Sequence, residues 1–324
     1  MKKVTIITGT YNLIKGEREE VFKEMLKSVY SQTYKNIEHL IIDGASDDGT
    51  LDLIDKLTKK QKNVRVISEP DKGIYDAMNK GIKKATGDYL IILNSDDHYT
   101  EDNAIELLVE AIEKNDAEFS VADSLFHNKF IYKANVEIFV ITHPFIHNTF
   151  LAKKELYKKY GNFDLSYEIG ADYDLIYRFL RNNLKYEKVD KVLTILRDGG
   201  FSTTDDKKAL EETKNVLEKN LNMSLSKRTV NTLFKNRNKI PVLTYIRMFC
   251  FIKAPCLKEC LISAVKNKKI KIDYSFFSAP LKNLVRGRFI LKPLERLIKG
   301  NKITKSFFYK IFPNRSFNKK HKKK

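Results

Sequence analysis

The sequence contains few cysteines and no long apolar run, and both shortages narrow the choice of protein class. Its 324 residues include three cysteines, which fall in one stretch as Cys250, Cys256 and Cys260. None forms a Cys-x-x-Cys pair and no histidine lies at zinc-finger spacing, so reduced cysteines in a helical segment are favoured over a metal or redox cluster. No stretch reaches the roughly 18 uncharged apolar residues of a membrane-spanning helix. With 42% hydrophobic and 31% charged residues, the composition is that of a soluble globular protein.

The first apolar run is also too short for a signal peptide. It follows Lys2 and Lys3, occupies residues 4–7 and soon meets Gly9-Thr10-Tyr11-Asn12, whereas a signal peptide needs a core of about 7–15 apolar residues. We therefore expect a buried first strand here and a cytoplasmic protein.

Acidic residues are scarce in the last third of the chain. Residues 221–324 hold 27 lysines and arginines but three acids, a net charge of +24, whereas residues 1–220 carry −5. Aromatic and aliphatic residues alternate with the basic ones, which is typical of an amphipathic helix on an anionic membrane surface. An oligomerisation segment, which would give a homo-oligomer, is the alternative, and both are favoured over nucleic-acid binding. Residues 319–324, nearly all lysine, are expected to be disordered.

This change in composition predicts two domains. We expect a catalytic domain at residues 1–220, and a basic, mainly helical C-terminal region at 221–324 that associates with membrane. Such a protein would be peripheral on the inner face of the cytoplasmic membrane, where it could reach a lipid-linked substrate.

The first hundred residues alternate short apolar runs with helical patterns. Strands are predicted at residues 4–8, 38–43, 63–68 and 89–93, and helices at 18–32, 73–85 and from Thr50 onward. Thr50 is expected to cap its helix, with Leu51, Ile54 and Leu57 as the buried stripe. Nearly continuous apolar strands between helices predict a doubly wound α/β fold with a parallel sheet covered on both faces.

Residues beyond 97 follow a less regular pattern. Helices are predicted at 103–114, 153–160 and 172–181, and strands at 119–122, 128–133 and 148–151. No internal repeat is present.

Three predicted strands end in polar clusters, which are Thr10-Tyr11-Asn12, Asp43-Gly44-Ala45-Ser46 and Asn94-Ser95-Asp96-Asp97. Ligands of doubly wound sheets bind beyond the carboxyl ends of the strands. A carboxylate there can accept hydrogen bonds from a uracil or a ribose. Adjacent carboxylates repel each other unless a divalent cation such as Mg²⁺ or Mn²⁺ binds them and bridges them to a diphosphate. The alternative, in which Asp96 and Asp97 cap the following helix, is disfavoured because two other polar strand ends accompany them.

Long motifs in this region carry a family resemblance. Residues 41–50 resemble the D-G-x-S-x-D-G-T element of inverting family-2 glycosyltransferases, which have a GT-A fold. Residues 68–82 resemble the S-E-x-D-x-G-I-Y-D-A-M-N-K-G block of the colanic-acid and O-antigen-type members, and residues 85–97 resemble the A-x-G-D-Y…L-N-S-D-D that follows. The resemblance covers about residues 3–205. It implies a Rossmann-like, nucleotide-sugar-binding α/β domain whose mixed, mostly parallel sheet is flanked by helices.

The resemblance also implies which residues bind the donor and a metal ion. The nucleotide would be held by Thr10, Tyr11, Asn12, Asp43, Asp71, Asn79, Ser95 and Asp96. Asp96 falls at the last position of the family's D-x-D metal motif, while Asn94 replaces the first Asp, so Asp97 stays a candidate ligand. Similar enzymes often carry a histidine before an apolar strand, which favours His147 over His143 as a third ligand; a structural histidine is the alternative.

Asp172 falls where the family places its general base. An acceptor hydroxyl must lose its proton as it attacks the anomeric carbon, and a carboxylate opposite the leaving diphosphate can accept it. An ordinary helix N-cap is the alternative for Asp172, and Asp174 is expected to be an exposed helical residue. Residues 199–202, Gly-Gly-Phe-Ser, resemble the family's flexible loop and would form either a lid or a turn.

These features predict an inverting glycosyltransferase assisted by Mn²⁺ or Mg²⁺. It would move a hexose or N-acetylhexosamine from a UDP-sugar to a hydroxyl of a growing surface glycan, free or lipid-linked. A nucleotidyltransferase on a similar sheet would need a Gly-rich, basic loop after the first strand, which residues 8–12 lack. A membrane-surface scaffold with a degenerate transferase domain is the third hypothesis, and Asn94 is the one feature that favours it.

Overall fold

The computed structural model describes residues 1–126, 130–197 and 205–235, with further scattered residues between 239 and 273. The chain divides into two compact units, Met1–Ile272 and Asp273–Lys324, whereas its composition changes at about residue 221. The three cysteines, the loop at 199–202 and the lysine-rich end lie outside the described residues.

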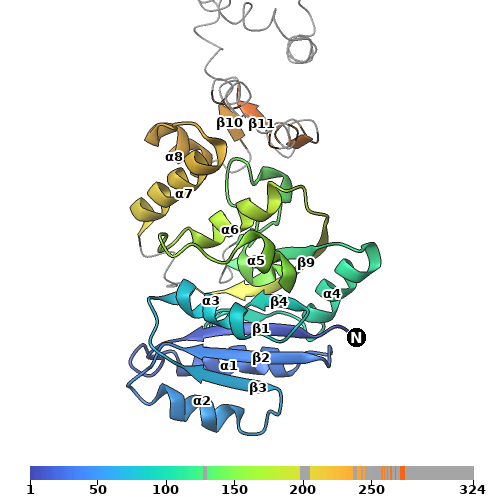
Figure 1. Cartoon of the computed structure of the whole chain (residues 1–324), viewed down its shortest axis with the longest axis vertical. Helices are drawn as coiled ribbons and strands as arrows, with labels where there is room; N and C mark the ends of the chain where they lie inside the picture. Colours follow the sequence, from blue (N-terminus) through green and yellow to red (C-terminus); the bar gives the residue numbers. More distant parts are fainter. Residues whose placement is uncertain are drawn as a thin grey trace, which may run out of the picture. The chain divides into compact units, whose positions relative to one another are not determined.

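The centre of the first unit is a mixed sheet with strand order β3-β2-β1-β4-β8-β6-β9-β5, in which β7 also pairs with β6 (Figure 1). Its strands are β1 (Val4–Thr10), β2 (Ile37–Asp43), β3 (Val64–Ser68), β4 (Tyr89–Ile92), β5 (His98–Tyr99), β6 (Phe119–Phe126), β7 (Phe130–Tyr132), β8 (Leu151–Lys153) and β9 (Tyr186–Leu196). The first four strands run parallel to one another. β8 is antiparallel to both β4 and β6, while β9 is parallel to β6. The predicted parallel arrangement is therefore correct for the first half of the sheet, and the second half is mixed.

Helices follow most of the strands. The first unit contains α1 (Glu19–Tyr30), α2 (Thr50–Thr58), α3 (Ile74–Lys84), α4 (Ala104–Asn115), α5 (Lys154–Tyr160), α6 (Ala171–Leu180), α7 (Asp206–Leu221) and α8 (Lys227–Lys235), the short 3₁₀ helices η1 (Val136–Ile138) and η2 (His147–Thr149), and a small sheet of β10 (Lys239–Pro241) with β11 (Lys271–Asp273). Neither α7 nor β9 is predicted from the sequence. Among the described helices, none is both long and apolar enough to cross a membrane.

The two faces of the sheet bury side chains of alternate residues. On one face Phe22 of α1 and Leu108 of α4 share a core with Ile6 of β1, and all three side chains are fully buried, each contributing roughly 1.5–3 kcal/mol. On the other face α3 lies against β1 and β2. A Cβ atom on Gly81 would lie 2.3 Å from Ile7, so glycine allows α3 to approach the strand this closely.

Two local predictions are wrong in detail. Gly49, with a φ of +90°, is the N-cap of α2, and Thr50 is the first helical residue, whose N–H donates to the Asp48 carboxylate. Leu51 of the predicted buried stripe is 37% exposed, while Ile54 is buried. Of the predicted strand at 148–151, residues 148 and 149 belong to the 3₁₀ helix η2, and the strand β8 begins only at Leu151.

Candidate active site

The carboxyl ends of three parallel strands meet at Asp43. Thr10 of β1 and Ser68 of β3 lie in register with it on either side. The Asp43 carboxylate is fully buried and accepts hydrogen bonds from the hydroxyls of Thr10 (3.2 Å) and Ser68 (2.8 Å), and from both the hydroxyl (2.6 Å) and the backbone N–H (2.9 Å) of Ser46. One carboxylate thus joins the ends of β1, β2 and β3.

An exposed aromatic ring borders this junction. Tyr11 is 64% exposed. A Cβ atom on Gly44 would lie 3.1 Å from the Tyr11 ring and 2.7 Å from Oδ2 of Asp71. The ring and the carboxylate therefore both lie next to the bare backbone of Gly44, an arrangement that suits a flat ligand with hydrogen-bond donors.

Two predicted ligand residues bond to the protein itself. Asn12, with a φ of +44°, donates its backbone N–H to Ser46 and accepts from Asp47 through its side chain. Both ends of the Asn79 amide pair with the backbone of Phe163, at 2.9 Å each. Asn79 therefore links α3 to the loop that precedes α6.

The segment 94–97 forms a turn directly after β4. Asp97 is buried, and its carboxylate accepts hydrogen bonds from the side chains of Asn94 (3.0 Å) and Asn148 (3.3 Å) and from the N–H of Arg197 (3.2 Å). Burial, followed by the negative charge of Asp96, raises the pKa of Asp97. The alternative in which these two carboxylates cap a helix is wrong, because α4 begins only at Ala104, with Asn103 as its N-cap.

Asp96 is the more accessible carboxylate of this turn. Its side chain is 16% exposed, and the guanidinium of Arg18 lies 3.9 Å from it. Ser95, beside it, is buried. In the described part of the chain no three histidine, cysteine or acidic side chains are grouped as a metal site, so Asp96, Asp97 and His147 do not form a ready three-ligand site.

Asp172 lies at the start of α6 in contact with two histidines. Its Oδ2 atom is 3.2 Å from Nε2 of His143 and 3.4 Å from Nδ1 of His147, and its Oδ1 atom is 3.5 Å from the hydroxyl of Tyr75. Burial opposes the negative charge, but the two imidazoles outweigh it and hold the pKa of Asp172 well below its usual range. The N-cap of α6 is Gly170, so the alternative of Asp172 as an N-cap is wrong.

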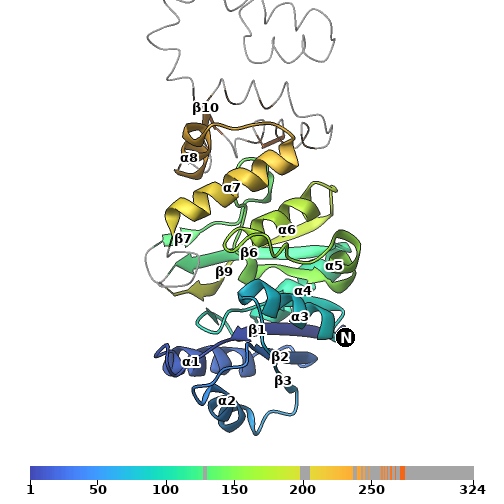
Figure 2. The ribbon, with the colours of Figure 1, turned by 60° about the vertical axis from the view of Figure 1, so that its left-hand side comes forward.

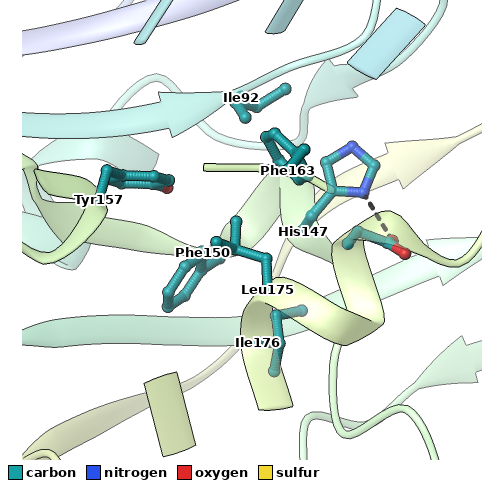
Figure 3. Close-up of a pocket in the computed structure, with 8 residues that line it drawn as sticks. Ile92, His147, Phe150, Tyr157, Phe163, Leu175 and Ile176 are labelled. Carbon is teal, nitrogen blue, oxygen red and sulfur yellow. Dashed lines mark ion pairs between the residues drawn. The ribbon is translucent and has the colours of Figure 1, made fainter. Parts of the chain in front are cut away.

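A small pocket brings this cluster next to the end of β4. It is lined by Asp172 and His147 together with Ile92, Phe150, Tyr157, Phe163, Leu175 and Ile176. In Figure 3 the dashed line from the labelled His147 ring marks its ion pair with Asp172, whose side chain is drawn without a label. The Nε2 atom of His147 is buried and has no hydrogen-bond partner among the described residues. Since Ile92 is the last residue of β4, the base candidate and the turn at 94–97 lie at the same end of the sheet.

The prediction for Asp174 is wrong. Its side chain is fully buried and forms ion pairs with Arg178 (2.8 Å) and Lys219 (3.1 Å). Arg178 also donates to the backbone carbonyls of residues 160–162. Asp174 is therefore a structural anion that joins α6 to α7 and to the loop after α5.

Around Asp172, Tyr75 and Glu212 were not predicted as site residues, and His143 was considered but ranked below His147. Tyr75 and His143 contact it directly, and Glu212 of α7 binds the backbone just before it. Tyr75 stands inside the motif at residues 68–82, so that motif could have indicated it. Glu212 lies far along the chain in a segment without a recognisable pattern.

The mixed sheet with its flanking helices is a GT-A-type fold, and comparisons with solved structures agree. The chain resembles Staphylococcus aureus TarS residues 1–349 in complex with UDP-GlcNAc, with a TM-score of 0.57 at 17% identity over 82% of this chain and 80% of that one. It also resembles the mannosyltransferase PcManGT from Pyrobaculum calidifontis in complex with GDP-Man and Mn²⁺, with a TM-score of 0.54 at 15% identity over 94% and 83%. These likenesses confirm the predicted fold.

The sequence comparisons identify the family. The family model described as glycosyl transferase family 2 matches residues 5–170. An uncharacterized glycosyltransferase of Mycobacterium tuberculosis is 32% identical over 54% of this chain and 68% of its own length, and one of Rickettsia typhi is 30% identical over 56% and 60%. Matches to Rickettsia felis and Rickettsia conorii proteins span 18% of those longer chains. The protein belongs to glycosyl transferase family 2.

Proposed function

We propose that the protein transfers a sugar from a UDP-sugar to a hydroxyl of a growing surface glycan, with inversion and with Asp172 as the general base. The observation that carries the proposal is the Asp172 carboxylate, held anionic by His143 and His147 beside the end of β4. A carboxylate placed there can accept the proton of an acceptor hydroxyl. The oxygen then bonds to the anomeric carbon, whose bond to the diphosphate breaks, and the nucleoside diphosphate leaves.

The nucleotide would bind at the ends of β1 to β3. Tyr11 offers an exposed ring for stacking, and Asp71 offers acceptor oxygens next to Gly44. Because the Asp43 carboxylate is buried and already accepts four hydrogen bonds, we assign it to holding the three strand ends that frame the base. The bound UDP-GlcNAc of TarS and GDP-Man of PcManGT support a nucleotide-sugar donor.

A divalent cation fits this site through Asp96. Mg²⁺ and Mn²⁺ are commonly held by one or two carboxylates together with phosphate oxygens and waters, and the Asp96 side chain is partly exposed whereas Asp97 is buried. The Nε2 atom of His147, which has no hydrogen-bond partner in the described part of the chain, is the candidate nitrogen ligand. When bound, the cation would neutralise charge on the departing diphosphate; the Mn²⁺ of PcManGT supports this assignment.

Two histidines hold Asp172 in its charged form. The ring nitrogens of His143 and His147 both face its Oδ2 atom, where an N–H group can donate to the carboxylate and stabilise its negative charge. In this proposal the imidazoles keep the carboxylate anionic, and the carboxylate itself accepts the proton of the acceptor hydroxyl. The imidazole of His143 also lies 5.3 Å from the Tyr173 ring, which helps to hold its orientation.

We also propose that residues 221–324 bring the enzyme to an anionic membrane surface that carries a lipid-linked acceptor. The support is the net charge of +24 interleaved with apolar residues. In a liposome flotation assay, the full chain should float with anionic vesicles at low salt and not with neutral ones. If the chain bound neither kind of vesicle, the result would favour the alternative that this region assembles a homo-oligomer.

A panel of nucleotide sugars tests the function directly. We expect release of UDP from one UDP-sugar in the presence of Mn²⁺, faster when a glycan acceptor is added, and little release of GDP or dTDP from the other donors. The variant Asp172→Asn removes the proposed base, and Asp116→Asn is its matched control. Asp116 is an exposed carboxylate whose φ of +47° suits asparagine. Release of pyrophosphate from nucleoside triphosphates instead would overturn the proposal, as would absence of any donor binding.

A further inference from the structure

We infer that Glu212 of α7 is a positioning residue for this reaction, because it fixes the backbone that carries Asp172. The inference rests on the proposed function, since it concerns the same site. Glu212 lies outside residues 5–170, which the family model matches. Its role is therefore one that the family match does not assign.

The Glu212 carboxylate binds three consecutive backbone N–H groups. Oε1 accepts from Glu168 at 3.0 Å, while Oε2 accepts from Ile169 at 2.8 Å and from Gly170 at 2.7 Å. Gly170 is the N-cap of α6, and Glu168 and Ile169 come just before it. Glu212 therefore binds the loop that leads into α6, with the N–H of the N-cap residue as its last donor.

The helix start is held from its other side by Tyr75. The Tyr75 hydroxyl donates to the carbonyl of Ile169 and lies 3.5 Å from Oδ1 of Asp172. The loop 168–170 is therefore bound through its N–H groups by α7 and through a carbonyl by α3. Asp172 follows this loop directly, so a shift of the loop moves the carboxylate relative to His143 and His147.

The negative charge of Glu212 matches its position. Glu212 is 7% exposed, and the positive end of the α6 dipole stabilises a carboxylate there. Nearby lysines of α7 pair with other acids: Lys208 with Glu168, and Lys219 with Asp174 and Asp164. A glutamine at 212 would keep the shape but would turn an amide N–H towards backbone N–H groups.

Other contacts hold α7 against α6, so the contact of Glu212 with residues 168–170 can be tested while α7 stays in place. Lys219 anchors α7 to α6 through the buried Asp174. Figure 2 shows α7 running alongside α6. At Gly170, a Cβ atom would lie 3.3 Å from the Cβ of Glu212, which confirms how closely the two backbones approach.

The experiment compares Glu212→Gln with Glu211→Gln in the full chain. Glu211 is the neighbouring exposed glutamate on α7 and serves as the matched control. We expect Glu212→Gln to lower kcat about 10- to 100-fold, as misplacement of a catalytic group does, while the Kd of UDP-sugar measured by calorimetry stays the same. The amides of residues 168–170 should exchange hydrogen faster in Glu212→Gln alone. Tyr75→Phe tests the same loop from its other side and should lower kcat in the same way.

Two results separate positioning from general stability. In an Asp172→Asn background, Glu212→Gln should cause no further loss of kcat, because residues that act through one group are not additive. Unchanged exchange at residues 168–170, unchanged kcat, or losses that multiply in the double variant would each overturn the inference. If the wild-type enzyme released no nucleotide from any donor, the proposed function would be overturned instead. Hydrogen exchange at residues 168–170 would still test whether Glu212 binds this loop.

Discussion

Replacement of Asp43 separates two roles that the sequence alone cannot distinguish. A residue that only contacts the nucleotide would change donor affinity, whereas a residue that joins β1, β2 and β3 would change the stability of the fold. The Asp43 carboxylate is fully buried and accepts four hydrogen bonds, three from hydroxyls and one from the N–H of Ser46. The second role is therefore expected to dominate.

The magnitude follows from the donors that would lose their acceptor. Hydrogen bonds to charged groups contribute about 1.5–3 kcal/mol each, and neutral ones about 0.5–1.5 kcal/mol. In Asp43→Asn the hydroxyls of Thr10, Ser46 and Ser68 can turn to suit the amide, so we expect a loss of about 2 kcal/mol in the free energy of unfolding. Asp43→Ala leaves the N–H of Ser46 without an acceptor and also opens a cavity. We expect it to lower the free energy of unfolding by about 4 kcal/mol.

Urea unfolding measures these losses. The transition midpoint should fall in the order wild type, Asp43→Asn, Asp43→Ala, with an unchanged slope against urea concentration. Calorimetry with UDP on the folded Asp43→Asn variant then reports any direct contact. A loss below about 1 kcal/mol in Asp43→Ala, together with a large loss of UDP affinity, would contradict the structural role.

Three further predictions concern the donor site, acid stability and α6. Tyr11→Ala should weaken UDP binding about 10-fold by calorimetry, since stacking of a base on an aromatic ring contributes roughly 1–3 kcal/mol; unchanged affinity would exclude stacking. Burial opposes the charge of Glu38, but hydrogen bonds from neighbouring side chains and backbone lower its pKa to about 2, below its ordinary 4.5. Its stabilisation is therefore complete above pH 4.5 and lost as pH falls towards 2, so the stability gap between wild type and Glu38→Gln should close over that window; a constant gap would refute the assignment. Asp174→Ala should lower the unfolding free energy by about 3–5 kcal/mol, because it leaves Arg178 without its buried partner; a loss typical of surface sites would show that the ion pair is dispensable.

The parts of the fold that the sequence predicted depend on contacts between near neighbours. In the motif at residues 41–50, Asp43 bonds Ser46, Asp48 bonds Thr50, and Gly49 takes a positive φ, all within eight positions. Because these contacts join residues that are close together in the chain, they appear in the sequence as a recognisable motif.

The missed features depend on contacts between distant residues. Asp174 was expected to be exposed because a charged helical residue is usually solvated, but Lys219 lies 45 positions away and neutralises it in the interior. Glu212 reaches residues 168–170 across a similar distance. Strand β9 was not predicted because lysine, glutamate and aspartate interrupt its apolar residues, and much of its length is only partly buried.

The central claim is that Asp172 removes the proton of the acceptor during sugar transfer. The most direct test is kcat for transfer by Asp172→Asn, measured beside the Kd of its donor and beside the Asp116→Asn control. We expect a fall in kcat of about 10²- to 10⁴-fold, the range of general base catalysis, with the donor Kd and the Asp116→Asn control unchanged. An Asp172→Asn enzyme that kept the kcat of the wild type would contradict it.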